Sequence, residues 1–90
     1  FAVKFLNDPS FQDLTDGLAA KDGEKAFRAA HTLKGVCLNL GFDKLYQASS
    51  DLTEQLRGKD TVEETDDLFL KVKEQYTILT EAIQELAAQS

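Results

Sequence analysis

The chain has 90 residues and a formal net charge of −6, and 42% of its residues are hydrophobic. This length suffices for one small domain with a buried core, and the hydrophobic share argues against disorder. The acidic balance argues against nucleic acid as a partner, since phosphate binding depends on clustered Lys and Arg. We therefore expect one acidic domain over residues 1–90.

Three features of the sequence indicate the cellular compartment in which the domain works. The chain begins at Phe1 rather than Met, so we expect it to be part of a longer sequence. No stretch reaches the roughly 18 consecutive apolar residues that cross a bilayer, and residues 1–10 are too short and polar for a signal peptide. A single cysteine, Cys37, cannot form an internal disulfide, as is usual in a reducing compartment. The expectation is a cytoplasmic domain without membrane contact.

Strong helix formers dominate the sequence, and no segment alternates cleanly with the period of two that is typical of a strand. Four breaks divide the chain into five helical pieces, at residues 7–9, 21–23, 41 and 57–60. The first piece, from Phe1 to about Leu6, is expected to be the end of a short helix. The second should begin with Asp8 as its N-cap and Pro9 at its first position, where the missing N–H costs nothing.

The remaining pieces have clear ends. The third is expected to run from a cap at Asp22 to about Leu40 and to stop at Gly41. The fourth should span about residues 43–56. The fifth should open with a capping box in which Thr61 and Glu64 each satisfy a backbone N–H. Its expected buried stripe is Val62, Thr65, Phe69, Val72, Tyr76, Leu79, Ile83 and Leu86.

No single helix is self-sufficient, because each carries one apolar stripe that must be buried against neighbours. The connections between the pieces are short, which favours antiparallel neighbours. The predicted fold class is all-α: an antiparallel four-helix bundle with a short additional N-terminal helix.

The third helix has two distinct faces. At about 100° per residue, one broad face gathers the residues expected to face the core, Ala26, Ala29, Ala30, Leu33, Val36, Cys37 and Leu40. His31 points almost directly away from this face. Phe27 lies one turn before it, Lys34 and Gly35 one turn after it, and Leu38 two turns after it.

These outer residues favour a docking surface around His31. A glycine inside a helix costs roughly 1 kcal/mol relative to alanine, and at Gly35 it leaves room for a large body to approach the imidazole. Phe27 and Leu38 are apolar on a solvent-facing stripe, and Lys34 places an ammonium suited to a phosphate beside the ring. Two alternatives stay open. Gly35 could permit close helix packing, and Phe27 and Leu38 could be covered by the first helix or by another chain.

The segment from His31 to Gly35, HTLKG, followed by Asn39-Leu40-Gly41, resembles the signature of the histidine-containing phosphotransfer (HPt) family. The resemblance extends over nearly the whole chain, including the Ala-rich approach to the motif and two more amphipathic helices after it. It implies a phosphorelay intermediate without its own kinase activity, nucleotide site, metal or other cofactor. Its partners would be a response-regulator receiver domain, a hybrid sensor histidine kinase, or both.

The resemblance also implies roles for single residues. His31 matches the residue that is phosphorylated on its imidazole, Lys34 the lysine that steadies the phosphoryl group, and Gly35 the small residue that admits the partner. The phosphoryl group would come from, or go to, a receiver aspartate, and the receiver would supply the Mg²⁺ and most catalytic groups. The chemistry agrees, because a neutral imidazole is a nucleophile near neutral pH.

Partner docking is expected to involve Phe27, Arg28 and Leu38. The two apolar side chains would supply contact area. Arg28 and Lys34 make this part of an acidic chain locally positive, which favours encounter with the acidic phosphorylation pocket of a receiver.

The side chain that orients the His31 ring is left open. Some members of the family place a Glu or Gln on the following helix for this purpose. This chain has Thr53 at that position and Ser50 one turn earlier. A hairpin after the third helix would bring this region opposite His31, so Ser49, Ser50, Thr53 or a water molecule is a candidate.

Other functions also fit a helical chain. One is a non-catalytic helical interaction module in which His31 is incidental. Another is the dimerisation domain of a histidine kinase, which also carries a phosphorylated helix histidine. That domain usually has an acidic residue directly after the histidine, where this chain has Thr32. A histidine enzyme is disfavoured, because there is no second His and no carboxylate cluster with metal-ligand spacing.

Overall fold

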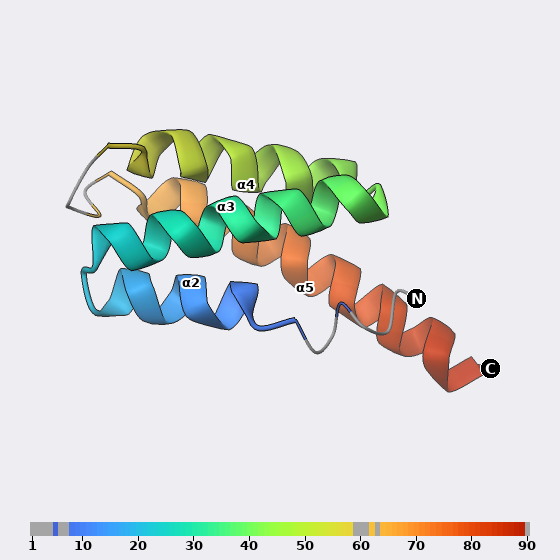
Figure 1. The fold of residues 1–90 in the computed structure, drawn as a ribbon. Coiled ribbons are helices and arrows are strands. Elements are labelled where there is room, and N and C mark those ends of the chain that lie inside the picture. Colours follow the sequence, from blue (N-terminus) through green and yellow to red (C-terminus); the bar gives the residue numbers. More distant parts are fainter. Residues whose placement is uncertain (1–4, 6–7, 59–61, 63, 90) are drawn as a thin grey trace.

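The computed structural model describes residues 5, 8–58, 62 and 64–89. Within these ranges the chain forms helices and no strand, as Figure 1 shows. The helices are α2 (Ser10–Ala19), α3 (Gly23–Leu40), α4 (Asp43–Leu56) and α5 (Asp66–Gln89). The prediction of an all-helical fold is confirmed for these residues. The expected short N-terminal helix falls on residues that, apart from Phe5, lie outside the described ranges.

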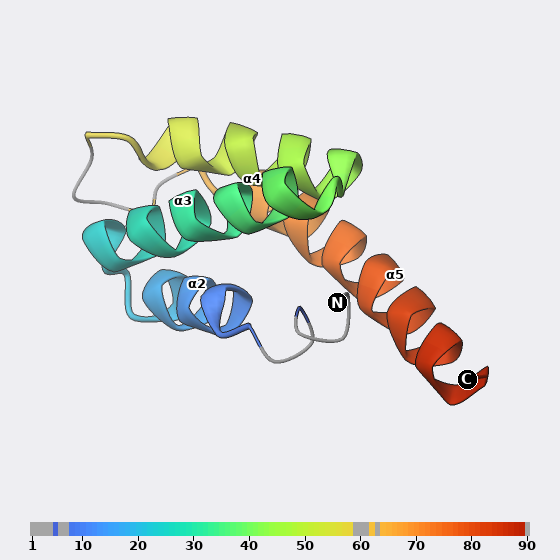
Figure 2. The same ribbon diagram turned by 45° about the vertical axis from the view of Figure 1, so that its right-hand side comes forward.

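The helix α3 lies at the centre of the arrangement. It packs against α2 on one side and α4 on the other, and α5 packs against α4 (Figure 1). Turning the molecule shows that the C-terminal part of α5 extends beyond the other helices (Figure 2). None of the described helices has the length and apolar character that crossing a membrane would require.

The two ends of α3 lie where the sequence predicts them. At its start, the Asp22 carboxylate accepts a hydrogen bond of 3.1 Å from the backbone N–H of Lys25. At its end, Gly41 adopts a left-handed conformation with φ of 76°. The N–H of Phe42 then donates to the carbonyl of Cys37 at 2.9 Å, which closes the helix with a Schellman-type turn. These caps fix the ends of α3, and between them residues three or four apart in sequence lie one turn apart on the same face.

The neighbouring helices also follow local signals. The helix α2 begins at Ser10, whose backbone N–H donates to the carboxylate of Asp8 at 2.8 Å. Pro9 between them has helical dihedral angles, φ −81° and ψ −4°. The helix α4 occupies the predicted span of residues 43–56. Both elements therefore agree with the sequence prediction within one residue.

The start of α5 differs from the prediction. The helix begins at Asp66, and Glu64 has a left-handed φ of 59° that no α-helix accommodates. The predicted capping box, in which Glu64 follows Thr61 inside the helix, is therefore wrong, and Thr61 itself lies outside the described residues. Instead the Thr65 hydroxyl donates to the carbonyl of Val62 at 2.5 Å and forms a turn ahead of the helix.

Side chains from all four helices and Phe5 form one hydrophobic core. Its buried members are Phe5, Leu14, Ala26, Ala29, Ala30, Leu33, Cys37, Leu45, Ala48, Leu52, Leu56, Val72 and Ile83. The expected core face of α3 is confirmed, with Val36 and Leu40 at its half-buried edges. The expectation for Leu86 is wrong: it is 67% exposed, because α5 has by then passed beyond its neighbours.

Gly17 allows α2 and α3 to approach closely. A Cβ at this position would lie 2.8 Å from the backbone nitrogen of Ala26, which is closer than real contacts allow. Gly17→Ala should therefore lower the free energy of unfolding by about 1–3 kcal/mol, although alanine is the better helix former. Urea unfolding monitored by circular dichroism measures the change. Stability equal to that of the wild type would show that the two helices can move apart at little cost.

Candidate functional site

His31 lies near the middle of α3 on the face that points away from the core. The residue is exposed, whereas Ala30 and Leu33 beside it are fully buried. Among the described residues, no hydrogen bond or ion pair involves its imidazole. The ring of Phe27, one turn earlier, is its aromatic neighbour, with 6.0 Å between the centroids and 42° between the planes. The imidazole is thus open to a partner from outside.

The surface next to His31 is open on its C-terminal side. Gly35 is exposed, and a Cβ built on it would meet no heavy atom within 4 Å, setting aside the backbone of α3 itself. The alternative that Gly35 permits close packing of described helices is therefore wrong. Leu38 is 63% exposed, and Lys34, one turn after His31, is half-buried. No described part of the chain shields this side of His31.

Phe27, on the N-terminal side of His31, is less exposed than Gly35 and Leu38. It is half-buried and packs against the core cluster. The guanidinium carbon of Arg57, just after α4, lies 5.4 Å from the centroid of the Phe27 ring, a distance typical of a cation–π contact. The expectation that Phe27 faces solvent as Leu38 does therefore needs correction, because the end of α4 covers part of its ring.

Arg57 is held from its other side by Glu54. Its Nε and Nη2 atoms donate to the two carboxylate oxygens of Glu54, each at 3.1 Å. Hydrogen bonding by Arg57, followed by its charge and more weakly that of Lys34, holds the pKa of the Glu54 carboxyl below its usual value. Both side chains are about half exposed. The face of His31 therefore includes an ion pair from α4 that the sequence analysis did not identify.

The sequence contains a signal for the contact of Arg57 with Phe27 and for its ion pair with Glu54. Phe27 and Arg57 are equally far along the chain from Phe42, where the hairpin between α3 and α4 turns. Pairing positions symmetrically about Phe42 would have placed them side by side. The spacing of Glu54 and Arg57, three residues apart, is also typical of an ion pair on one helix face.

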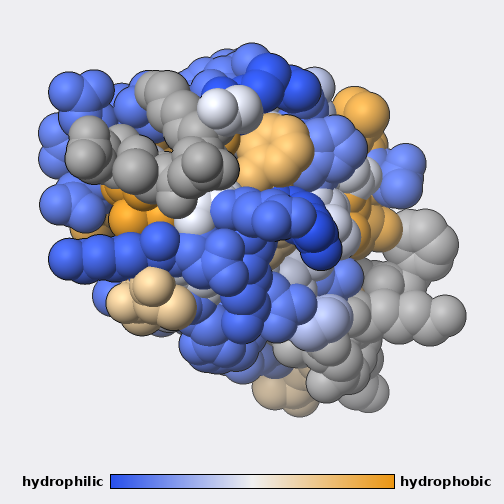
Figure 3. All heavy atoms as spheres, turned by 60° about the vertical axis from the view of Figure 1, so that its left-hand side comes forward, coloured by the Kyte–Doolittle hydropathy of each residue, from blue (hydrophilic) through white to orange (hydrophobic). Residues whose placement is uncertain are grey.

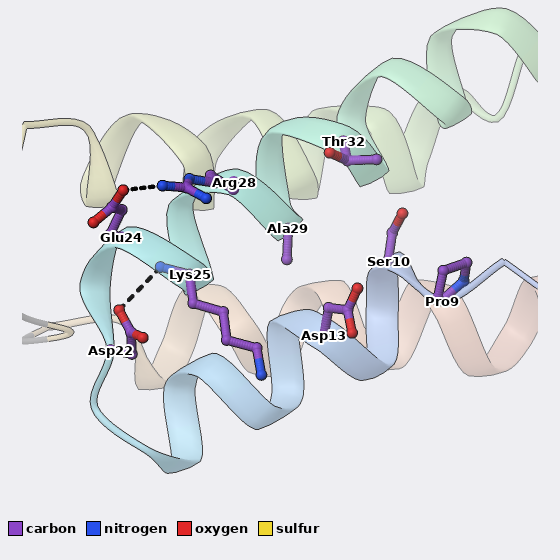
Figure 4. A pocket seen from close by; sticks show the side chains of 9 residues that line it. All are labelled: Pro9, Ser10, Asp13, Asp22, Glu24, Lys25, Arg28, Ala29 and Thr32. Carbon is purple, nitrogen blue, oxygen red and sulfur yellow. Dashed lines mark hydrogen bonds and ion pairs between the residues drawn. The ribbon is translucent and has the colours of Figure 1, made fainter.

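Arg28 lies on the other flank of His31, beside α2. Its guanidinium forms an ion pair with Glu24, and both side chains are highly exposed. Together with Thr32 and Asp13 they line an open groove of about 510 Å³ between α2 and α3, shown in Figure 4. The carboxylate of Glu24 therefore offsets the positive charge expected from Arg28. No group of three or more potential metal ligands occurs among the described residues.

The candidates for orienting the His31 ring are not joined to it in the described structure. Thr53 is fully buried, and its hydroxyl donates to the carbonyl of Ser49 at 2.7 Å. The Ser49 hydroxyl is also fully buried and has no hydrogen-bond partner among the described residues. Ser50 is half-buried. No hydrogen bond between His31 and these three residues is present in the described part of the chain.

The single cysteine does not belong to this site. Cys37 is fully buried on the core face of α3. Burial and, secondly, the negative charge of Asp8 raise the pKa of its thiol to about 12. The thiol therefore stays protonated at neutral pH and is a poor nucleophile. Its contribution is packing, as expected from its position on the helix.

Comparison with protein families identifies the chain. A family model described as "Hpt domain" matches residues 7–89, which include His31 and all four described helices. Comparisons with curated proteins and with solved structures gave no match. Because the family model covers nearly the whole sequence, the chain belongs to the Hpt domain family.

Proposed function

We propose that this chain is a phosphorelay intermediate in which His31 accepts a phosphoryl group from, and passes it to, aspartates of response-regulator receiver domains. Membership of the Hpt family implies a part in two-component phosphorelay signalling. The observation that carries the proposal is the exposed His31 in the middle of a well-anchored helix, with the open position of Gly35 one turn away. A receiver domain, free or part of a hybrid sensor kinase, can reach the imidazole there.

The transfer itself exchanges one bond for another. An unprotonated imidazole nitrogen of His31 attacks the phosphorus atom of an aspartyl phosphate. The new P–N bond forms as the P–O bond to the aspartate breaks, and the receiver's carboxylate leaves. The reverse reaction returns the group to an aspartate. Because the phosphoryl donor is another protein, we propose that this domain acts without kinase activity of its own.

Two neighbours of His31 have distinct roles in this proposal. Lys34 lies one turn away on the same helix, and its long flexible side chain can bring the ammonium to a phosphoryl group on the imidazole and stabilise the negative charge of that group. Gly35 has no side chain that would keep a receiver away from the ring. Leu38, further along the same face, offers apolar area for contact, and Arg28 with its Glu24 partner borders the site on the side of α2.

The proposal also covers the setting of the domain. We take residues 1–90 to be one domain with the antiparallel bundle topology, supported by the short connections at residues 20–22 and 41–42 between neighbouring helices. We place the exchange in the cytoplasm, because the single buried thiol suits a reducing compartment.

The direct test is phosphoryl transfer from a receiver domain. A receiver labelled with ³²P on its aspartate is mixed with the purified chain, and the label on each protein is followed with time. We expect label to move to this chain and to be lost in acid but kept in alkali, as a phosphoramidate requires. If no phosphorylated receiver transfers label to the folded chain, the helical interaction module is the better interpretation.

Lys34→Ala should shorten the lifetime of the phosphohistidine without unfolding the domain. A partly exposed contact between opposite charges contributes about 0.5–1.5 kcal/mol, so the phosphohistidine should hydrolyse about two- to tenfold faster. The half-life of the isolated phosphorylated protein measures this at two salt concentrations. An unchanged half-life in both would show that Lys34 does not contact the phosphoryl group.

Leu38→Ala and Phe27→Ala should separate docking from folding. Leu38 is mostly exposed, so its loss should leave stability within about 0.5 kcal/mol while weakening receiver binding several-fold. Phe27 packs against the core, so its loss should lower the free energy of unfolding by about 1–2 kcal/mol. Calorimetric titration with a receiver and thermal melting of each variant give both quantities. Full binding by Leu38→Ala would exclude Leu38 from the interface.

A further inference from the structure

Two contacts hold Arg57 over Phe27, the aromatic neighbour of the exposed His31. Its guanidinium lies above the ring of Phe27, and the Phe27 ring neighbours the imidazole of His31. The bidentate contact with Glu54 restrains the same group from the side. An arginine on a protein surface normally loses rotamer freedom when it binds a partner. Here two contacts have already restricted the side chain, so binding through it loses less entropy.

The guanidinium of Arg57 keeps hydrogen-bonding capacity toward solvent. Arginine has five N–H donors in a planar fork, and the contact with Glu54 uses one on Nε and one on Nη2. The remaining donors on Nη1 and Nη2 are free to bind a second carboxylate in the same plane. The side chain of Arg57 is 52% exposed, so such an acceptor can reach it.

The surroundings favour a charged rather than an apolar contact at this end of the bundle. The view toward the end of α4 shows a mainly hydrophilic surface with small, separate hydrophobic areas (Figure 3). The exposed Leu38 lies at the other end of α3, near Gly41. A partner over His31 would thus meet an apolar side chain at one end and the guanidinium at the other.

We infer that Arg57 is a partner-binding residue, which Glu54 and the ring of Phe27 hold ready to bind a carboxylate on the acidic surface of the receiver that meets His31. The inference rests on the proposed function and adds to it a contact from α4. Glu54 acts through Arg57 and is a positioning residue. The pKa of the Glu54 carboxyl is lowered chiefly by its hydrogen bond to Arg57, which agrees with a direct contact between the two groups.

The first test compares charge-matched variants for binding to a phosphorylatable receiver. Arg57→Gln should weaken binding about two- to fivefold at low ionic strength, and the difference should shrink as salt is added. Lys71→Gln, which removes the same charge from an exposed position on α5, should change binding little. Arg57→Lys should keep the association rate and raise the dissociation rate, since it retains the charge and loses the planar fork. Equal effects of Arg57→Gln and Lys71→Gln would overturn the inference.

The role of Glu54 is tested by whether Glu54→Gln strengthens or weakens receiver binding. Removing a carboxylate from a face that meets an acidic partner should tighten binding if only net charge matters. If Glu54 positions Arg57, Glu54→Gln should instead weaken binding, whereas Glu81→Gln on the far part of α5 should not. Tighter binding by Glu54→Gln would refute the positioning role. In every variant, phosphoryl transfer to His31 is followed separately, because its absence in the wild type would refute the proposed function and not this contact.

Discussion

Replacing His31 by Gln is expected to abolish phosphorylation of the chain by any receiver. His31 is the only histidine in the sequence, and the other strongly nucleophilic side chain, Cys37, is buried and protonated. Glutamine is polar and a good helix former, and position 31 is exposed, so stability should change by less than about 0.5 kcal/mol. Transfer of ³²P and the thermal melting curve are measured on the same preparation.

A relocated histidine provides the matched control. Gln84 is exposed on α5, away from Lys34 and Gly35. Adding Gln84→His to His31→Gln restores one exposed helix histidine but not its neighbours, and we expect no phosphorylation of this double variant. Label retained by His31→Gln alone would place the phosphoryl group on another residue. Label regained by the double variant would show that the neighbours of His31 do not matter.

Gly35→Gln should stabilise the fold and block the function. No described atom lies near a Cβ at this position, so the added side chain meets no clash. Replacing a helix-interior glycine by a better helix former should raise the free energy of unfolding by about 0.5 kcal/mol. The same side chain stands one turn from His31 and keeps the receiver at a distance. Transfer should fall by roughly a hundredfold, the effect of displacing reacting groups by about 1 Å.

A graded series tests whether access is the cause. Gly35→Ala should raise the free energy of unfolding by about 1 kcal/mol, more than Gly35→Gln does, because alanine is the better helix former. It should lose only part of the transfer rate, because a methyl group extends little above the helix surface. Urea unfolding and single-turnover transfer rates give the two quantities for each variant. A marked loss of stability in either variant, or transfer unaffected by Gln, would contradict the access argument.

The helices that carry the site were predictable because their ends depend on local chemistry. Asp22 caps α3 through a hydrogen bond to a residue three positions away, and Gly41 supplies the left-handed conformation that ends the helix. Both signals need only neighbouring residues, so the sequence alone contains them. Between these ends the apolar residues of α3 recur on one face, so the sequence also predicts which face is buried and leaves His31 exposed opposite the buried alanines.

The errors arose where packing between distant segments decides the outcome. The turn at Glu64 overrides a capping pattern that is plausible in isolation. Leu86 continues the apolar spacing of α5, but its exposure depends on where the neighbouring helices stop. Phe27 points away from the core of α3 on a helical wheel, yet the end of α4 brings Arg57 over it. A helical wheel describes one helix alone, so it does not show which of its residues a neighbouring helix covers.

The contribution of α4 to the face of His31 has an evolutionary consequence. His31, the proposed phosphoacceptor, belongs to α3, whereas Glu54 and Arg57 belong to the exposed side of α4 and the turn after it. Substitutions at such exposed positions seldom disturb folding. On the inference that Arg57 binds the receiver, a duplicated gene could change these two side chains, and with them its preferred receivers, while the helix that carries His31 stays the same. Paralogous relays within one cell could become insulated from each other by this route.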